Sequence, residues 1–175
     1  EDGGEVTELN EQIPVRPPVM CAGCPHRGTF YVLKKLGLNV CGDIGCYTLG
    51  ATPPLSALHT TVCMGSSVTI MSSLTKILGK DKAVAVIGDS TFCHSGIEGL
   101  VNCAYNKTKG VIIILDNGTT AMTGAQPNPA TGVTAKGEQT KRLDLVTLCK
   151  ACGADNVEVI GDSSAVIESK IKEYT

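Results

Sequence analysis

Short runs of branched apolar residues alternate along this chain with segments of helical periodicity. Residues 83–87 and 111–115 contain no polar side chain, which is typical of strands buried on both faces of a parallel sheet. A helix expected over residues 92–105 joins these strands into a βαβ unit. The polar residues that follow each apolar run mark the ends of the strands.

The remaining segments extend this alternation of strands and helices. Further helices are expected over residues 27–36, 65–78, 143–152 and 163–171, and further strands over residues 38–41 and 157–160. The pattern predicts an α/β fold with an open, mostly parallel sheet and helices on both faces. The aperiodic stretch 118–141, rich in Gly, Thr, Pro and Asn, is expected to be a functional loop because loops of this length are otherwise uncommon in compact domains.

The first residues differ in character from the rest of the chain. Residues 1–19 are polar and contain Pro14, Pro17 and Pro18, so we expect a linker there and one domain over residues 20–175. The chain begins Glu-Asp-Gly-Gly-Glu without an initiator Met. This beginning is unlike a signal peptide and is expected of a segment cut from a longer chain.

The composition of the chain bears on which partners and which cellular location are expected. The chain has 175 residues, 42% of them apolar, and a net charge of −2, so neither nucleic acid nor a membrane surface is an expected partner. Its apolar runs are far shorter than the roughly 20 residues of a membrane span. Nine cysteines are present, and in so aliphatic a chain they favour a reducing, cytoplasmic location over a disulfide scaffold.

Candidate chemistry lies directly after the two apolar strands. Asp89 and Asn117 follow neighbouring strands at the edge where parallel sheets bind ligands. Their oxygens suit Mg²⁺, which commonly shares its coordination shell with phosphate, and Ser90 and Thr91 begin a helix whose free N–H groups attract an anion. Each turn taken singly is also an ordinary capped helix start or a tight turn. Together they predict a diphosphate bridged by Mg²⁺.

The same residues carry a resemblance to a known family. Gly88-Asp89-Ser90 followed by Asp116-Asn117-Gly118-Thr119 resembles the thiamine diphosphate motif. The surrounding sequence, over about residues 14–132, resembles the 2-oxoacid:ferredoxin oxidoreductases. The segments that carry this wider resemblance are Arg16-Pro17-Pro18, Cys21-Ala22-Gly23-Cys24-Pro25-His26-Arg27-Gly28, Cys63-Met64-Gly65 and Met122-Thr123-Gly124-Ala125-Gln126.

The resemblance implies a set of cofactor contacts. Asp89 and Asn117 are implied to ligate Mg²⁺ by their side chains, and Thr119 by its backbone carbonyl. Ser90 stands where many relatives have Gly. The residues implied to lie along thiamine diphosphate are Ile44, Gly45, Cys46, Tyr47, Met64, Gly65, Gly88, Ser90, Thr91, Ala121 and Met122.

The resemblance also implies partners. In the family, the Glu that activates the aminopyrimidine ring comes from a separate pyrimidine-binding domain, and no corresponding segment occurs here. Glu98, in the helix after the Mg²⁺ turn, is expected on the wrong side of the cofactor. The implied partners are therefore the pyrimidine-binding and ferredoxin-like domains of the same chain, a second subunit, ferredoxin and coenzyme A.

Three cysteines are candidate metal ligands. Cys21 and Cys24 have a C-x-x-C spacing, and Cys46 follows an Ile-Gly pair, as in relatives that carry a [4Fe–4S] cluster near thiamine. Cys149 and Cys152 both lie downstream of the thiamine motif, and neither has the context expected of a fourth ligand. A structural Zn²⁺ and free or buried thiols are the alternatives.

Three histidines complete the candidate set. His59 and His94 lie near the predicted site and are candidates for binding a 2-oxo acid carboxylate or for proton transfer, with purely structural roles equally open. His26 is expected to cap a helix or to hydrogen-bond a cluster sulfur.

The resemblance implies oxidative decarboxylation of arylpyruvates to acyl-CoA, with electrons passed to ferredoxin. Two alternatives stay open from the sequence. One is a non-oxidative thiamine diphosphate-dependent decarboxylase of similar 2-oxo acids, and the other is a non-catalytic cysteine-metal module.

Overall fold

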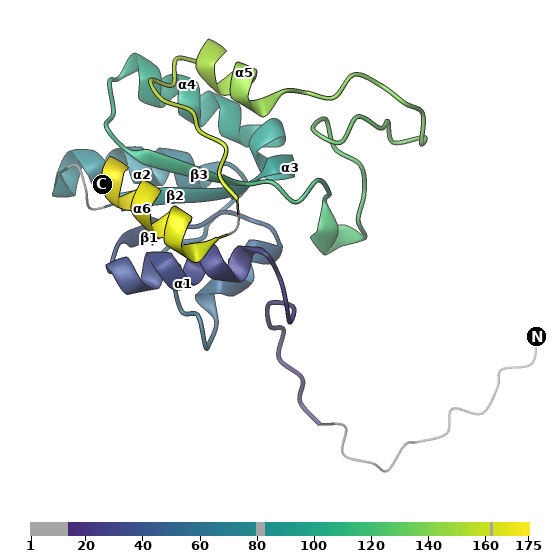
Figure 1. The fold of residues 1–175 in the computed structure, drawn as a ribbon, viewed down its shortest axis with the longest axis horizontal. Coiled ribbons are helices and arrows are strands. Elements are labelled where there is room, and N and C mark those ends of the chain that lie inside the picture. The colour runs from purple at the N-terminus through teal and green to yellow at the C-terminus, as the bar shows by residue number, and fades with distance from the viewer. Residues whose placement is uncertain (1–13, 80–82, 162) are drawn as a thin grey trace, which may run out of the picture.

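The core of the fold is a parallel sheet with strand order β1-β2-β3 (Figure 1). The structure, a computed structural model, describes residues 14–79, 83–161 and 163–175. Strand β2 (Ala83–Gly88) pairs in parallel with β1 (Asn39–Cys41) and with β3 (Val111–Leu115). All six residues of β2 are buried, as its uninterrupted apolar sequence predicts.

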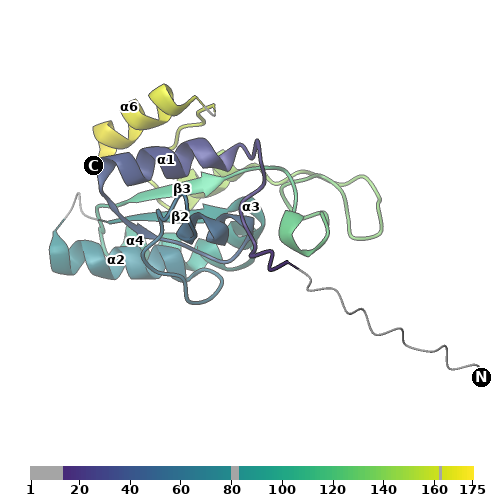
Figure 2. The same cartoon turned by 90° about the horizontal axis from the view of Figure 1, so that it is seen from below.

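Helices cover both faces of the sheet (Figure 2). One face carries α1 (His26–Leu36) and α6 (Ser164–Tyr174), and the other carries α2 (Ser66–Leu78), α4 (Ile97–Tyr105) and α5 (Leu145–Ala151). Side chains of β2 alternate between the two layers: Val84 and Val86 pack with α1 and α6, whereas Ala85 and Ile87 pack with α2 and α4. The predicted α/β class is therefore confirmed.

The helix after β2 begins before the predicted range 92–105, close to the helix start predicted at Ser90 and Thr91. It starts at Asp89, directly after the strand, with α3 (Asp89–Thr91), continues through a π-helical turn over Phe92–Gly96, and ends in α4. Phe92 is fully buried in the layer of α2 and α4. A π-helical turn next to a strand end is a feature often found at functional sites.

The predicted strand over residues 157–160 is wrong. That segment forms no strand, and Val159 and Ile160 are exposed. Its β-branched residues satisfy the local pattern, but a strand also needs a neighbour with which to pair. Here Glu158 instead accepts hydrogen bonds from Lys170 and Tyr174 of α6, so the segment is tied to a helix rather than to β3.

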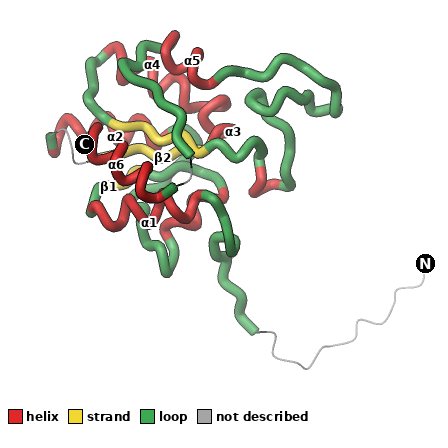
Figure 3. Tube along the Cα trace, in the orientation of Figure 1, coloured by secondary structure: helices red, strands yellow, loops and turns green. Residues whose placement is uncertain are grey.

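The strand predicted over residues 111–115 is β3 with the predicted bounds, and the other predicted elements are present with shifted ends. The long loop joins β3 to α5 (Figure 3). Of the predicted linker, only residues 14–19 are described, and they are exposed coil that ends at buried Met20. None of the helices in the described ranges is long and apolar enough to cross a membrane.

A salt-linked contact joins α6 to α1. Glu168 accepts hydrogen bonds from Lys172 and Lys35, both at 2.7 Å. These bonds hold the pKa of Glu168 at about 2, below its usual 4.5. Because the folded-state pKa is depressed, the stabilisation is present above pH 4.5 and is lost as the pH falls towards 2.

Replacing Glu168 with Gln should therefore lower the Tm slightly at pH 7 and have little effect near pH 2. Differential scanning calorimetry at the two pH values measures the difference. The decrease at pH 7 should shrink in high salt because the ion pairs are exposed. A decrease of equal size at both pH values would show that the charges of this contact do not stabilise the fold.

Candidate functional site

The carboxyl ends of the three strands form one edge of the sheet. Gly88 of β2 is in register with Leu115 of β3, so Asp89 and Asp116 leave adjacent strands at the same level. The loop after β1 leaves from the same edge, since Cys41 is paired with Ala85. Helix α3 and the long loop lie beyond these strand ends (Figure 1). The topology thus places residues after all three strands at one edge.

Asp89 is a buried carboxylate with few partners. It is 2% exposed, and among the described residues its carboxylate accepts one hydrogen bond, from Asn128 Nδ2 to Oδ2 at 3.2 Å. An ionised carboxylate taken out of water is costly unless several donors or a cation compensate it. The Asp89 side chain is therefore suited to a cation.

The loop after β3 lies against the start of α3. Thr120 Oγ1 donates a hydrogen bond to Ser90 Oγ at 2.8 Å. Asn117 is exposed, and its Oδ1 accepts from Thr119 N at 3.2 Å in a tight turn. The carbonyl oxygen of such an amide has a second lone pair that remains free to bind a ligand. The hydrogen bond from Thr120 thus connects the turn at Asn117 to the start of α3, where Asp89 and Ser90 lie.

The loop after β1 is tied to the same helix start. Thr91 Oγ1 and Tyr47 Oη both donate to the Ile44 carbonyl at 2.9 Å. A Cβ on Gly88 would lie 2.6 Å from Tyr47 Cε1, so glycine is needed there to let the tyrosine ring approach. Burial raises the pKa of Tyr47 to about 12, and the phenol therefore stays protonated at neutral pH.

Asp43 is a second buried carboxylate, and its role was not predicted from the sequence. It is fully buried, and its oxygens accept from the backbone N–H groups of Ile44, Gly65 and Ser67, each at 2.9 Å. It thereby satisfies free N–H groups at the N-terminus of α2 from 22 residues away. Asp43 is fully satisfied by the protein itself, which is the opposite of Asp89.

The turn before α2 approaches the π-helical turn closely. Gly65 has φ +86°, and a side chain there would collide with the backbone of Ser95. Glycine is required because of the positive φ and because of this close approach.

The predicted cofactor contacts next to this turn and in the long loop are exposed. Met64, which precedes Gly65, is 41% exposed, and Met122 in the long loop is 49% exposed. The predicted residues Ala121 and Met122 form a short 3₁₀ turn (Ala121–Thr123) and are exposed.

The histidines are placed differently from one another. His59 Nδ1 accepts from the Val40 backbone N–H at 3.0 Å, so this ring is bound to the middle of β1. His94 is exposed and contacts Ser95 Oγ at 3.1 Å. His26 does not cap α1, because the cap position is Pro25.

His26 is instead a buried neighbour of the site. It is 7% exposed. Burial lowers the pKa of His26, and the charge of Asp89 partly opposes that effect. Helix α1 therefore presents a buried, predominantly neutral imidazole within electrostatic range of the Asp89 carboxylate, a placement that its sequence context did not predict.

Cys21, Cys24 and Cys46 share one neighbourhood. Burial raises the pKa of Cys46, and the nearby thiols of Cys21 and Cys24 raise it further. No group of three or more His, Cys, Asp or Glu side chains in residues 14–79, 83–161 and 163–175 is arranged to hold a metal ion. The three thiols, as placed, do not form such a group. Cys149 and Cys152 lie on and just after α5, on the face opposite α1.

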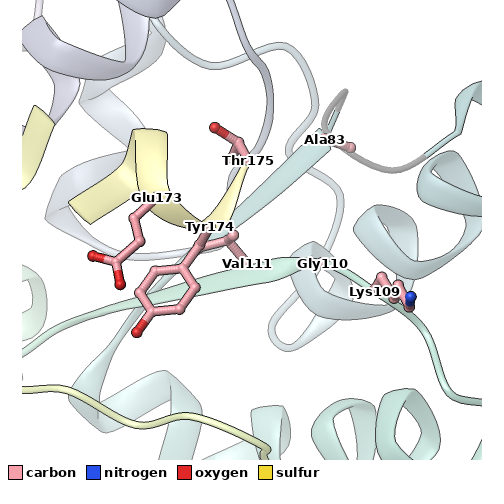
Figure 4. Close-up of a pocket in the computed structure, with 7 residues that line it drawn as sticks. All are labelled: Ala83, Lys109, Gly110, Val111, Glu173, Tyr174 and Thr175. Atoms are coloured by element: carbon pink, nitrogen blue, oxygen red, sulfur yellow. The ribbon is translucent and has the colours of Figure 1, made fainter. Parts of the chain in front are cut away.

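A surface pocket lies at the opposite end of the strands (Figure 4). It has a volume of about 260 Å³ and is formed where β2 and β3 begin and α6 ends. Its lining residues are Ala83, Lys109, Gly110, Val111, Glu173, Tyr174 and Thr175. This pocket is separate from the polar residues at the carboxyl edge.

The fold and this edge define a class of protein: an α/β domain with a parallel sheet, in which ligands are expected beyond the carboxyl ends of the strands. Residues 43–175 match the family model of the thiamine pyrophosphate enzyme C-terminal TPP-binding domain. The chain belongs to this family of thiamine diphosphate-binding domains.

Relatives with assigned names are similar over most of this chain. The chain is 44% identical over 161 residues to the indolepyruvate oxidoreductase subunit IorA of Archaeoglobus fulgidus, matching 89% of this chain and 26% of that protein. It is 43% identical over 169 residues to the subunit of the same name from Pyrococcus horikoshii, matching 87% of this chain and 26% of that protein. The chain thus spans about a quarter of the length of these relatives.

A solved structure supports the fold. The 2-oxoglutarate:ferredoxin oxidoreductase from Magnetococcus marinus, solved with 2-oxoglutarate, coenzyme A and succinyl-CoA bound, superposes with a TM-score of 0.63. The match covers 79% of this chain and 53% of that chain at 16% sequence identity. At this identity the likeness concerns the path of the backbone.

Proposed function

We propose that this chain is the diphosphate- and Mg²⁺-binding domain of a thiamine-dependent 2-oxoacid:ferredoxin oxidoreductase that acts on arylpyruvates. The family and the named relatives support the reaction class. The observation that carries the site is Asp89, a carboxylate 2% exposed with one amide donor. A cation at this position would supply the positive charge that compensates the buried carboxylate.

The residues at the edge fit Mg²⁺ in their chemistry. Asp89 would supply a carboxylate oxygen, Asn117 an amide oxygen and Thr119 a backbone carbonyl, all of them hard donors. With a single carboxylate among the three ligands, the remaining positions are left for the diphosphate and water, as is usual for Mg²⁺ bound with phosphates.

The remaining predicted contacts surround the same edge. Ser90 and Thr91 at the start of α3 would bind the diphosphate through hydroxyl and backbone N–H groups. The segment from Ile44 to Tyr47 and the Met64-Gly65 turn would lie along the rest of the cofactor, with Ala121 and Met122 on the loop side. When bound, thiamine diphosphate supplies the carbanion chemistry, and the protein supplies position and charge neutralisation.

Further domains complete this proposal. The chain spans 26% of its relatives' length, and Glu98 is exposed on α4. We therefore assign the aminopyrimidine-activating Glu to a pyrimidine-binding domain outside this sequence. A ferredoxin-like segment, a second subunit, ferredoxin and coenzyme A complete the proposed reaction. The chain alone should bind the cofactor weakly and show no turnover.

Two measurements test the proposal. Calorimetric titration of the chain with thiamine diphosphate should show binding with Mg²⁺ and none with EDTA. The whole protein should reduce ferredoxin with indolepyruvate only when coenzyme A is present. Aldehyde release without ferredoxin reduction would instead indicate a non-oxidative decarboxylase. Metal binding without any thiamine diphosphate binding would favour the cysteine-metal module.

The cluster prediction has its own measurement. Iron and acid-labile sulfide analysis of the anaerobically purified chain shows whether Cys21, Cys24 and Cys46 hold a [4Fe–4S] cluster, and zinc analysis tests the alternative. If neither metal is present, the three thiols are free and the electron route lies in other domains.

A further inference from the structure

Asn128 joins the long loop to the Asp89 carboxylate. It lies between β3 and α5, is 7% exposed, and is 39 residues from Asp89 in sequence. Its Nδ2 donates to Asp89 Oδ2 at 3.2 Å, while its Oδ1 accepts from the Ala130 backbone N–H at 2.9 Å. Reversing the amide would set its oxygen against the carboxylate and its NH₂ against the Ala130 N–H. Only one orientation of this side chain therefore satisfies both partners.

The backbone around Asn128 is also fixed. Thr131 Oγ1 donates to the Asn128 carbonyl at 2.8 Å and accepts from the Asn128 N–H at 3.3 Å. The Leu143 N–H donates to the Pro129 carbonyl at 2.9 Å. These contacts hold Asn128 in place from both sides, so its NH₂ group has little freedom to follow a moving carboxylate.

The hydrogen bond from Asn128 makes the two carboxylate oxygens of Asp89 different from each other. Oδ2 accepts from Asn128, whereas Oδ1 accepts from no other described side chain or backbone group. Mg²⁺ requires near-octahedral geometry and small ligand spacing, whereas Ca²⁺ accepts a carboxylate through both oxygens and tolerates irregular geometry. A carboxylate with one oxygen engaged and the other free is suited to the single-oxygen mode.

We propose that Asn128 is a positioning residue that holds Asp89 for single-oxygen binding and thereby sets a preference for Mg²⁺ over Ca²⁺. This inference rests on the proposed cation site at Asp89. Outer partners of metal-ligating residues commonly change metal affinity by about 10–100-fold when they are removed.

The test compares both cations in the full chain with thiamine diphosphate present, using calorimetric titration. Asn128→Ala should weaken Mg²⁺ binding by about 10–100-fold and Ca²⁺ binding much less, so the Mg²⁺/Ca²⁺ affinity ratio falls. Asn128→Leu, which fills the volume but has no donor, should give the same change. Thr134→Ala is the matched control, since it removes a hydrogen bond to Glu138 N within the same loop, and it should preserve the ratio.

The titrations distinguish a failure of the role of Asn128 from a failure of the proposed function. Equal losses for the two cations in both Asn128 variants would show a merely structural role and overturn the inference, as would an unchanged Mg²⁺ affinity. If the wild-type chain binds neither cation with thiamine diphosphate, the proposed function itself is wrong. A wild type that binds Mg²⁺ together with variants of unaltered ratio would contradict only the role of Asn128.

Discussion

Replacing Asp89 with Asn should abolish Mg²⁺-dependent thiamine diphosphate binding while leaving the metal-free chain as stable as the wild type. The amide has nearly the shape of the carboxylate, and its oxygen can still accept the Asn128 hydrogen bond. It lacks the negative charge that a divalent cation needs at this buried position. Because losing an outer partner alone costs about 10–100-fold in metal affinity, losing the ligand should cost at least about 100-fold.

The stability half of this prediction follows from the burial of the charge. A carboxylate that is 2% exposed accepts one hydrogen bond from the described residues, and Asn can keep that bond, so the neutral side chain should not lower the free energy of unfolding. Calorimetric titration and urea denaturation measure the two effects. Asp144→Asn is the control, because Asp144 is an exposed carboxylate that caps α5 and has no part in the proposed site. If Asp89→Asn keeps wild-type affinity, the cation site lies elsewhere.

Replacing Asp43 with Asn should have the opposite outcome, a large loss of stability. The Asp43 carboxylate accepts three backbone N–H bonds at 2.9 Å, and an amide would present an NH₂ group to at least one of these donors. A buried donor left without an acceptor costs about 1–3 kcal/mol, and more where the lost acceptor was charged. We expect the free energy of unfolding to fall by about 3 kcal/mol.

Urea denaturation of the Asp43→Asn chain measures this loss. Asp144→Asn is the control: Asp144 caps α5 by accepting from Val146 N and Thr147 N, and Asn is an equally good N-cap residue. The control should therefore be much less destabilised. Equal stability of Asp43→Asn and wild type would show that the loop after β1 and the start of α2 are held together by other contacts.

The contrast between the two carboxylates shows which features a sequence can predict. The strands β2 and β3 were predictable because uninterrupted branched apolar residues favour a parallel strand. The expected burial on both faces is confirmed for β2 but wrong for β3, where four of the five residues are partly exposed because β3 lies at the edge of the described sheet. The placement of Asp89 and Asn117 at one edge followed from that topology alone. By contrast, the β-branched residues near Val159 were misleading, because strand formation there depends on a pairing partner that the local pattern does not show.

The roles of Asp43, Asn128 and His26 could not be predicted for a related reason. Their partners lie far away in sequence: Asp43 binds the N-terminus of α2, Asn128 donates to Asp89 from the long loop, and the pKa of His26 on α1 is raised by the charge of Asp89 against the effect of burial. Nothing in the local sequence of these residues specifies such contacts. Only the folded chain brings the buried donors and acceptors together, so polar positioning residues were missed while apolar elements were found.

The most direct test of the account is the position of the divalent cation itself. Mn²⁺ prefers the same oxygen ligands as Mg²⁺ and is visible by anomalous diffraction. In crystals of the chain grown with thiamine diphosphate and Mn²⁺, we predict one strong anomalous peak about 2.1 Å from an Asp89 carboxylate oxygen, shared with the Asn117 side chain and the diphosphate. A bound cofactor whose Mn²⁺ peak contacts neither residue would contradict the account.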